Sequence, residues 1–191
     1  MRYEFFPVST QELAADIRYE AIKETTFQVG GITIRTQFTN HPIRSLGYRL
    51  TEGGRTLVYT GDHEPYYNLF EGDAGGDDDP LFGGVDSTVD DANGRFVEFV
   101  RGADVFVCDS QYTPAEYPAR YRNWGHSSWD YCLGWMADAG ARKMVLTHHD
   151  PLRADTAIDA ILAEVREAAP GRGLDPASIL AAQEGLELEV G

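Results

Sequence analysis

The chain has 191 residues, of which 42% are apolar and 12% aromatic, enough for one sizeable hydrophobic core but too few for two full domains. It carries 16 Lys and Arg against 31 Asp and Glu, a net charge of -15. Because nucleic-acid affinity is built mainly on cationic side chains that neutralise phosphates, this balance weighs against a nucleic-acid partner. It leaves room for a small phosphate ester held by a metal.

Apolar runs in the sequence are all shorter than the roughly 20 residues that span a membrane, and no signal-peptide pattern follows Met1. The two cysteines, Cys108 and Cys132, each lie in an apolar run far from the other. They are predicted to be reduced core residues rather than a disulfide. The sequence therefore predicts a cytoplasmic protein without a membrane partner.

The first sixty residues are predicted to be largely antiparallel strand. Ser9-Thr10-Gln11-Glu12 fits a capping box, so a short helix is expected from about Gln11. From Ile17 the apolar residues alternate with a period of two, which predicts strands at 26–29 and 32–38 joined at Gly30-Gly31. A second hairpin is predicted from 46–50 and 56–59.

An acidic stretch follows. There is no Lys or Arg between Thr56 and Gly94, while Asp and Glu are frequent there. This composition predicts a solvated loop or insertion at 65–94 within a single domain that spans 1–191. A calcium loop is the alternative, but the aspartates do not have EF-hand spacing.

Beyond that stretch, strands and helices alternate. Helices are predicted near 96–100, 129–136 and 158–165, and buried strands at 104–108, which ends in Asp109, and at 144–146. Segments 178–181 and 186–190 are predicted to form a closing hairpin. Antiparallel strands followed by strand-helix alternation predict an α/β fold in which helices pack on a mixed sheet.

Polar side chains collect where these elements stop. The residues at such boundaries are His41, Asp62, His126 and His148, and ligand-binding residues in layered α/β folds gather at strand ends. Imidazole and carboxylate suit Zn²⁺, Mn²⁺ and Fe²⁺, and a carboxylate can bridge two ions. Spacing alone is weak support, because a single histidine is more often a surface or hydrogen-bonded residue, and Asp150-Pro151 is more typical of a turn.

Several motifs, taken in order, resemble a known superfamily. The chain resembles the later two-thirds of a metallo-β-lactamase-fold hydrolase and is most similar to the branch of ribonuclease Z and phosphoribosyl cyclic phosphate phosphodiesterase. The resemblance implies an αββα sandwich and a dinuclear, usually zinc, site. The segments that carry it are Phe6-Pro7-Val8-Ser9, Asn40-His41-Pro42, Leu46-Gly47-Tyr48-Arg49, Val58-Tyr59-Thr60-Gly61-Asp62, Gly125-His126-Ser127-Ser128 and Leu146-Thr147-His148-His149.

The resemblance also implies roles. His41 matches a histidine on one metal, Asp62 the bridging aspartate, and His148 the last histidine on the second metal. His126 matches the histidine of the branch's His-Ser-Thr segment, which stabilises the phosphate or protonates the leaving group in phosphodiester cleavage; Ser128 departs from that segment. The implied activity is hydrolysis of a small or cyclic phosphodiester by metal-activated water, with two Zn²⁺, or Mn²⁺ or Fe²⁺, as cofactors.

Other functions stay open. Ribonuclease Z-like RNA processing ranks lower because of the acidic charge. Hydrolysis of thioesters, lactones or β-lactams fits the same superfamily, and a non-catalytic binding protein is the alternative of a different class.

One departure from the family pattern affects the metal site. The His-x-His-x-Asp-His motif is expected upstream of Phe6, and no His-x-His occurs in this sequence. Each metal would then have only two protein ligands, when a catalytic zinc usually has about three, so the chain by itself is predicted to be inactive.

Three explanations follow: a sequence that begins downstream of the motif, complementation by a second chain, or a non-catalytic descendant. Without that segment, exposed apolar surface is expected along residues 17–38, with aggregation or a homodimer as the consequence.

Overall fold

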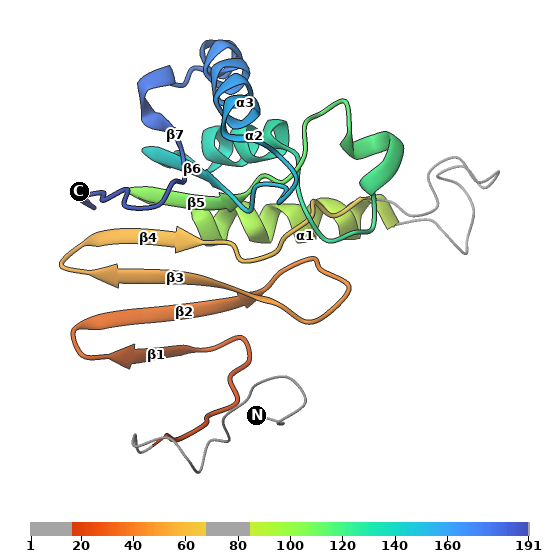
Figure 1. Ribbon diagram of the computed structural model, residues 1–191. Helices are drawn as coiled ribbons and strands as arrows, with labels where there is room; N and C mark the ends of the chain where they lie inside the picture. The colour runs from red at the N-terminus through yellow and green to blue at the C-terminus, as the bar shows by residue number, and fades with distance from the viewer. Residues whose placement is uncertain (1–16, 68–84, 191) are drawn as a thin grey trace.

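The protein is described by a computed structural model that covers residues 17–67 and 85–190. The predicted helix near Gln11 lies outside these ranges. The described strands form one seven-stranded mixed sheet in the order β1-β2-β3-β4-β5-β6-β7 (Figure 1). The strands are β1 (Thr26–Val29), β2 (Ile32–Phe38), β3 (Leu46–Glu52), β4 (Arg55–Tyr59), β5 (Val105–Asp109), β6 (Lys143–Thr147) and β7 (Ile179–Ala181).

The N-terminal half of the sheet is a pair of consecutive hairpins. Strands β1 to β4 pair antiparallel with their neighbours, as the alternating pattern predicted. Gly30 and Gly53 have φ angles of 58° and 56° in the two turns, a backbone conformation that glycine adopts without a steric penalty. Residues 17–25 contain no strand, so the predicted alternation from Ile17 does not extend β1.

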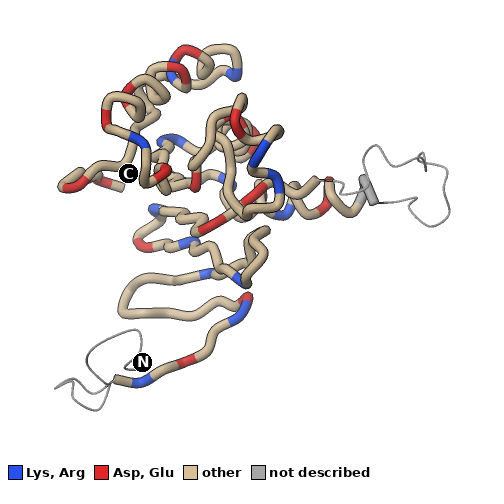
Figure 2. The backbone as a smooth tube through the Cα atoms, turned by 45° about the vertical axis from the view of Figure 1, so that its right-hand side comes forward, with Lys and Arg blue, Asp and Glu red and all other residues tan. Residues whose placement is uncertain are grey.

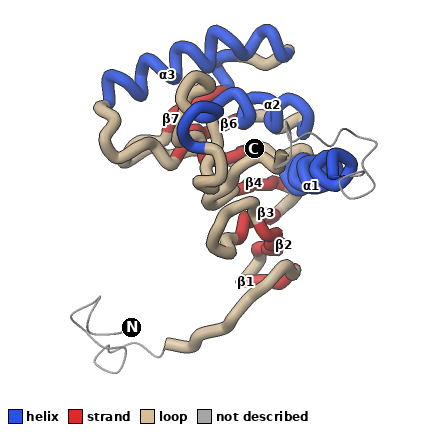
Figure 3. Tube along the Cα trace, turned by 90° about the vertical axis from the view of Figure 1, so that its right-hand side faces the viewer, coloured by secondary structure: helices blue, strands red, loops and turns tan. Residues whose placement is uncertain are grey.

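The C-terminal half of the sheet is parallel. Strand β4 pairs parallel with β5, β5 with β6, and β6 with β7. The crossovers are made by the long helices α1 (Val85–Val100), α2 (Trp129–Ala139) and α3 (Asp155–Ala168), which lie on one side of the sheet (Figure 3). Mixed pairing with flanking helices confirms the predicted α/β class.

The hydrophobic core lies between this sheet and the helices. Every second residue of the central strands faces the helices, and Val58, Phe106 and Met144 are fully buried there. Helix α1 contributes Phe96 and Phe99 to the same cluster. Cys108 and Cys132 are both buried in it and free, which confirms the prediction of reduced core cysteines.

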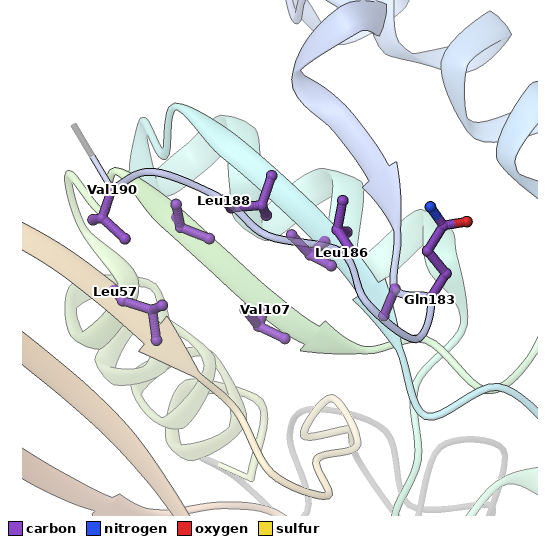
Figure 4. Close-up of a pocket in the computed structure, with 9 residues that line it drawn as sticks. Leu57, Val107, Gln183, Leu186, Leu188 and Val190 are labelled. Atoms are coloured by element: carbon purple, nitrogen blue, oxygen red, sulfur yellow. The ribbon is translucent and has the colours of Figure 1, made fainter.

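The opposite face of the sheet has a different cover. Residues 186–190 cross it in extended form (Figure 4), so that Leu186, Leu188 and Val190 line a cavity of about 190 Å³ over β4 to β6. The alternate residues of this segment, Glu187 and Glu189, are exposed. The predicted closing hairpin is therefore wrong: β7 pairs parallel with β6, and 186–190 forms no strand.

The prediction of an acidic loop is corrected at its C-terminal end, and the prediction of exposed apolar surface near the N-terminus is confirmed. Helix α1 begins at Val85, so residues 85–94, which were assigned to the acidic loop, are helical. Composition misled here because Asp90 and Asp91 lie on an amphipathic helix whose apolar face is buried. Exposed apolar surface along 17–38 is confirmed, since Tyr19 and Val29 are 73% and 57% exposed.

Acidic positions are spread over much of the described chain, including α3 and the C-terminal segment (Figure 2). No helix within 17–67 and 85–190 has the length and apolar character needed to cross a membrane.

Candidate metal centre

The candidate site lies at the end of the sheet where the carboxyl termini of four strands meet. Strands β2, β4, β5 and β6 run in the same direction, because β2 and β4 are each antiparallel to β3 and β4 to β6 are parallel. Their carboxyl ends therefore meet at one edge, where α/β proteins bind ligands. His41, Asp62, Asp109 and His148 follow or close these strands in that order.

Asp62 is placed by a turn after β4. Gly61 has a φ of 63°, and its position cannot take a side chain without approaching the Leu46 carbonyl at 3.0 Å. The Thr39 hydroxyl donates a hydrogen bond of 2.6 Å to the Asp62 carbonyl. The backbone is thereby fixed on both sides, and the carboxylate is left 40% exposed toward the site.

The two oxygens of Asp62 face different histidines. Oδ2 lies 3.9 Å from His41 Nε2 and Oδ1 lies 3.7 Å from His148 Nε2. The His41 Nδ1 atom is occupied by the backbone of Ile43, which leaves Nε2 pointing to the site. Each oxygen of the carboxylate therefore faces a different imidazole, and both residue types are donors that suit divalent metal ions.

Asp109 is a second carboxylate in the site, and it is 1% exposed. Its Oδ2 lies 2.7 Å from His126 Nδ1, and its Oδ1 lies 3.5 Å from His148 Nδ1. Burial raises the pKa of Asp109, but the contacts with the two histidines outweigh burial, and the net pKa lies below its ordinary value. The hydrogen bond with Asp109 in turn raises the pKa of His148.

His126 lies in the loop before α2. It lies two residues before the N-cap residue Ser128, at the element boundary where the sequence placed it and outside the helix itself. Its ring stacks on His148 with centroids 4.5 Å apart and meets His41 edge-on at 5.5 Å. Because a carboxylate can only accept, Nδ1 is the donor in the contact with Asp109, and Nε2 is the ring nitrogen that this contact leaves available.

A buried carboxylate holds the loop that carries His126. Glu64 accepts hydrogen bonds from the Tyr117 hydroxyl at 2.6 Å, from the Asn123 amide at 2.7 Å and from the Gly125 amide at 2.8 Å. Burial and this carboxylate both raise the pKa of Tyr117. The hydroxyl therefore stays protonated as a donor, and the loop is fixed against the end of the sheet.

His63 is adjacent to the site in sequence but belongs to the core. It is fully buried, stacks on Phe96 with centroids 3.8 Å apart, and accepts a hydrogen bond at Nδ1 from the Asn40 amide. Burial lowers the pKa of His63 to about 3. The imidazole is therefore neutral and structural. Asp150 accepts from the Leu152 amide, as expected of a turn.

The structure thus brings together all four predicted residues and adds one. Single ligand atoms of Asp62, Asp109, His126 and His148 all lie within 4.8 Å of one another, and His41 contacts Asp62 from the other side. Two carboxylates with three imidazoles are a donor set that fits divalent zinc, manganese or iron. Asp109 was missed, although it closes a buried strand at the same edge as Asp62.

Solved structures similar to this one share a single fold. The metallo-β-lactamase-fold protein YhfI of Bacillus subtilis is 19% identical, with a TM-score of 0.60 over 92% of this chain and 58% of that one. Human tRNase Z, short form, is 16% identical, with a TM-score of 0.53 over 88% of this chain and 48% of that one. A diphosphatase of the PhnP family is 17% identical, with a TM-score of 0.53 over 98% of this chain and 54% of that one. This chain therefore has the metallo-β-lactamase fold, with a side-chain cluster suited to metal at the carboxyl ends of its strands.

Residues 2–149 match the family model of the beta-lactamase superfamily domain, and the chain belongs to that family. A curated relative, uncharacterized protein ML1173 of Mycobacterium leprae, is 31% identical over 124 residues, which are 64% of this chain and 33% of that protein. The chain therefore spans about a third of this relative and about half the length of the solved structures that it matches.

Proposed function

We propose that this domain hydrolyses small phosphodiesters, with cyclic phosphodiesters as the leading substrates. The observation that carries the proposal is the hydrogen-bonded pair of Asp109 and His126 beside the Asp62 carboxylate. Such a pair supplies a positioned proton donor, which the cleavage of a phosphodiester with a poor leaving group requires. Two of the fold neighbours, a tRNase and a diphosphatase, are named for cleaving phosphate bonds.

Metal ions fit the site through His41, Asp62 and His148. Divalent ions bound there would lower the pKa of water and neutralise charge on the phosphate oxygens, which is the chemistry they supply to phosphoester hydrolysis. We assign zinc as the native metal, with manganese or iron as alternatives, because imidazole nitrogens outnumber carboxylates among these ligands.

His126 is assigned the role of general acid. As water adds to phosphorus and releases a proton to solvent, the bond between phosphorus and the leaving oxygen breaks, and that oxygen takes a proton from Nε2 of the His126 imidazolium, which solvent then protonates again. Asp109 accepts a hydrogen bond from Nδ1, with 2.7 Å between the nitrogen and Oδ2, so it fixes the ring and stabilises its charged form. In a cyclic phosphodiester the protonated leaving oxygen becomes a hydroxyl group of the ring-opened phosphomonoester; in an open diester it departs with the alcohol.

The test separates metal binding from proton transfer. Because the 191-residue chain by itself is predicted to be inactive, the test uses a version that also carries a His-x-His-x-Asp-His segment ahead of Phe6. This protein is loaded with Zn²⁺, its metal content is measured by mass spectrometry, and turnover is followed on a cyclic phosphodiester. Asp62→Ala is expected to lose metal. His126→Ala is expected to keep its metal and lose about 10²- to 10⁴-fold in turnover, the usual contribution of a positioned general acid.

Two results would count against the proposal. If His126→Ala stripped the metal, His126 would be a ligand and its assigned role would be wrong. If the metal-loaded protein cleaved a thioester, a lactone or a β-lactam and no phosphodiester, one of the other hydrolase functions would replace this one. A protein that binds metal and turns over none of these substrates would be the non-catalytic alternative.

A further inference from the structure

A group of stacked rings borders the candidate metal centre on the segment before His126. Tyr121 stacks on Tyr112 with centroids 4.1 Å apart and an interplanar angle of 4°. Trp124 meets Tyr121 edge-on at 5.5 Å and 88°. Tyr112 is buried, Tyr121 is half-buried and Trp124 is 59% exposed. We call these three residues the aromatic platform. Its outer member, Trp124, contacts Tyr121 and is otherwise open to solvent.

The aromatic platform is joined directly to the site. The Tyr112 ring lies 6.4 Å from the ring of His126. The residue after Trp124, Gly125, has a φ of 88° and packs so closely on His41 that a Cβ atom there would collide with the imidazole. The Glu64 carboxylate accepts a hydrogen bond from the Gly125 amide. Trp124 is therefore positioned by the same loop that places His126.

The charge of this segment differs from that of the chain as a whole. There is no Asp or Glu between Tyr117 and Trp129, whereas the segment contains Arg120 and Arg122 and the chain carries -15 overall. The Arg120 guanidinium lies 5.4 Å from the Tyr121 ring centroid, and that of Arg122 lies 4.3 Å from the Tyr67 ring centroid. An exposed ring, Trp124, in a segment that carries two arginines suits a ligand that has both a π-face and negative charge.

We infer that Trp124 determines substrate specificity by stacking on an aromatic group of the substrate. The substrate class is a small phosphodiester whose ester group bears a purine, pyrimidine or aryl ring, with the phosphate at the metal centre and the ring on the platform. This inference rests on the proposed function and narrows it. A single stacked ring accommodates one nucleoside rather than a polymer, in keeping with the acidic remainder of the chain.

The experiment compares two substrates with the same five-membered phosphodiester ring, adenosine cyclic phosphate and glycerol cyclic phosphate. Trp124→Ala, made in the Zn²⁺-loaded protein that carries the His-x-His-x-Asp-His segment, is expected to raise KM for the adenosine substrate about tenfold, which corresponds to about 1.4 kcal/mol of lost stacking. KM for the glycerol substrate and both kcat values stay unchanged. Trp124→Phe retains most of the affinity, and Tyr19→Ala, which removes an exposed ring outside the site, changes neither substrate. An equal change on both substrates, or none on either, overturns the inference.

A protein that cleaves neither substrate would defeat the proposed function without deciding the stacking. Isothermal titration calorimetry with adenosine monophosphate and glycerol phosphate tests the stacking on Trp124 without requiring turnover. Stacking predicts that Trp124→Ala weakens adenosine monophosphate binding about tenfold and leaves glycerol phosphate binding unaltered. Equal affinities of the wild type for the two ligands would rule out the platform as a ring-binding surface.

Discussion

At the scale of single residues, the side chains of the candidate metal centre are held in place by contacts with neighbouring residues. Asp62 is set by a glycine turn and the Thr39 hydroxyl, and His126 by Asp109. Gly125 provides the contact between the His126 loop and His41. Ligands positioned in this way bind metal with little reorganisation, so a backbone position can matter as much as a ligand.

Gly125→Ala is expected to displace His41 and weaken Zn²⁺ binding by tenfold or more, at the low end of the usual loss when a metal site's supporting contacts are removed. The matched control is Gly102→Ala. Gly102 also has a positive φ, 64°, but nothing lies within 4 Å of its added Cβ. Both variants lose about 1–2 kcal/mol of stability from left-handed strain. Zinc affinity by calorimetry should fall only for Gly125→Ala; an equal affinity in the two variants would contradict the contact.

His63 makes the stability of the metal-free protein depend on pH. Burial lowers the pKa of His63 from 6.5 to about 3. Between these pH values the imidazole is protonated in the unfolded chain and neutral in the folded chain. The stabilisation is complete above pH 6.5 and is lost as pH falls toward 3. The change is on the order of 5 kcal/mol, from the difference between these two pKa values at 1.36 kcal/mol per pKa unit.

The glutamine variant isolates this effect. His63→Gln can still accept from the Asn40 amide and does not titrate. Urea unfolding of both proteins with chelator present, across this pH range, should show a shallower fall for the variant. Carboxylates common to both proteins cancel in the difference, so equal slopes would mean that His63 is solvated.

At the scale of elements, the extended C-terminal segment covers the side of the sheet that the helices leave open. Leu186, Leu188 and Val190 face β4 to β6, and the alternating Glu187 and Glu189 face solvent. Because this segment makes no strand pairing, apolar contact is what holds it on the sheet. Its removal would expose Val105 and Val145, both buried now.

Leu188→Lys is expected to lower the free energy of unfolding by about 1–2 kcal/mol, because it exchanges a half-buried apolar contact for a charge. Glu187→Lys, which makes a larger change of charge at an exposed position next to it, should change stability by less than about 0.5 kcal/mol. Chemical denaturation measures both. Similar losses in the two variants would mean that the segment does not pack as described.

At the scale of the whole molecule, apolar surface is unevenly covered. The helices pack over the parallel half of the sheet, and β1 stands away from them (Figures 1 and 3). Among the described strands, β1 pairs only with β2, and Val29 at its end is exposed. An edge strand with exposed apolar neighbours is a surface that pairs with another chain.

We therefore predict that the 191-residue chain self-associates as a homodimer or larger species, measurable by light scattering coupled to gel filtration. Val29→Lys should shift the population toward monomer because a charge at the edge opposes pairing. Leu152→Lys, at a position 95% exposed but away from the edge, should not. A monodisperse wild-type monomer that melts cooperatively would refute this.

The sequence by itself determined the elements whose patterns are local. Alternation and paired glycines predicted both hairpins, and apolar runs predicted β5, β6 and the faces of α2 and α3, because periodicity reports which side of an element is buried. Strand ends and the superfamily resemblance singled out His41, Asp62, His126 and His148. These residues do lie together at the candidate metal centre.

The tertiary structure alone decided what depends on contacts between distant segments. The start of α1 at Val85 was hidden in an acidic composition, and residues 186–190 alternate like a strand yet pack on the sheet without pairing. Asp109 became part of the centre only when parallel β4, β5 and β6 placed their ends at one edge. A sequence specifies which residues are buried through local periodicity, but which carboxylate meets which imidazole is set by strand order, and strand order is a property of the folded chain.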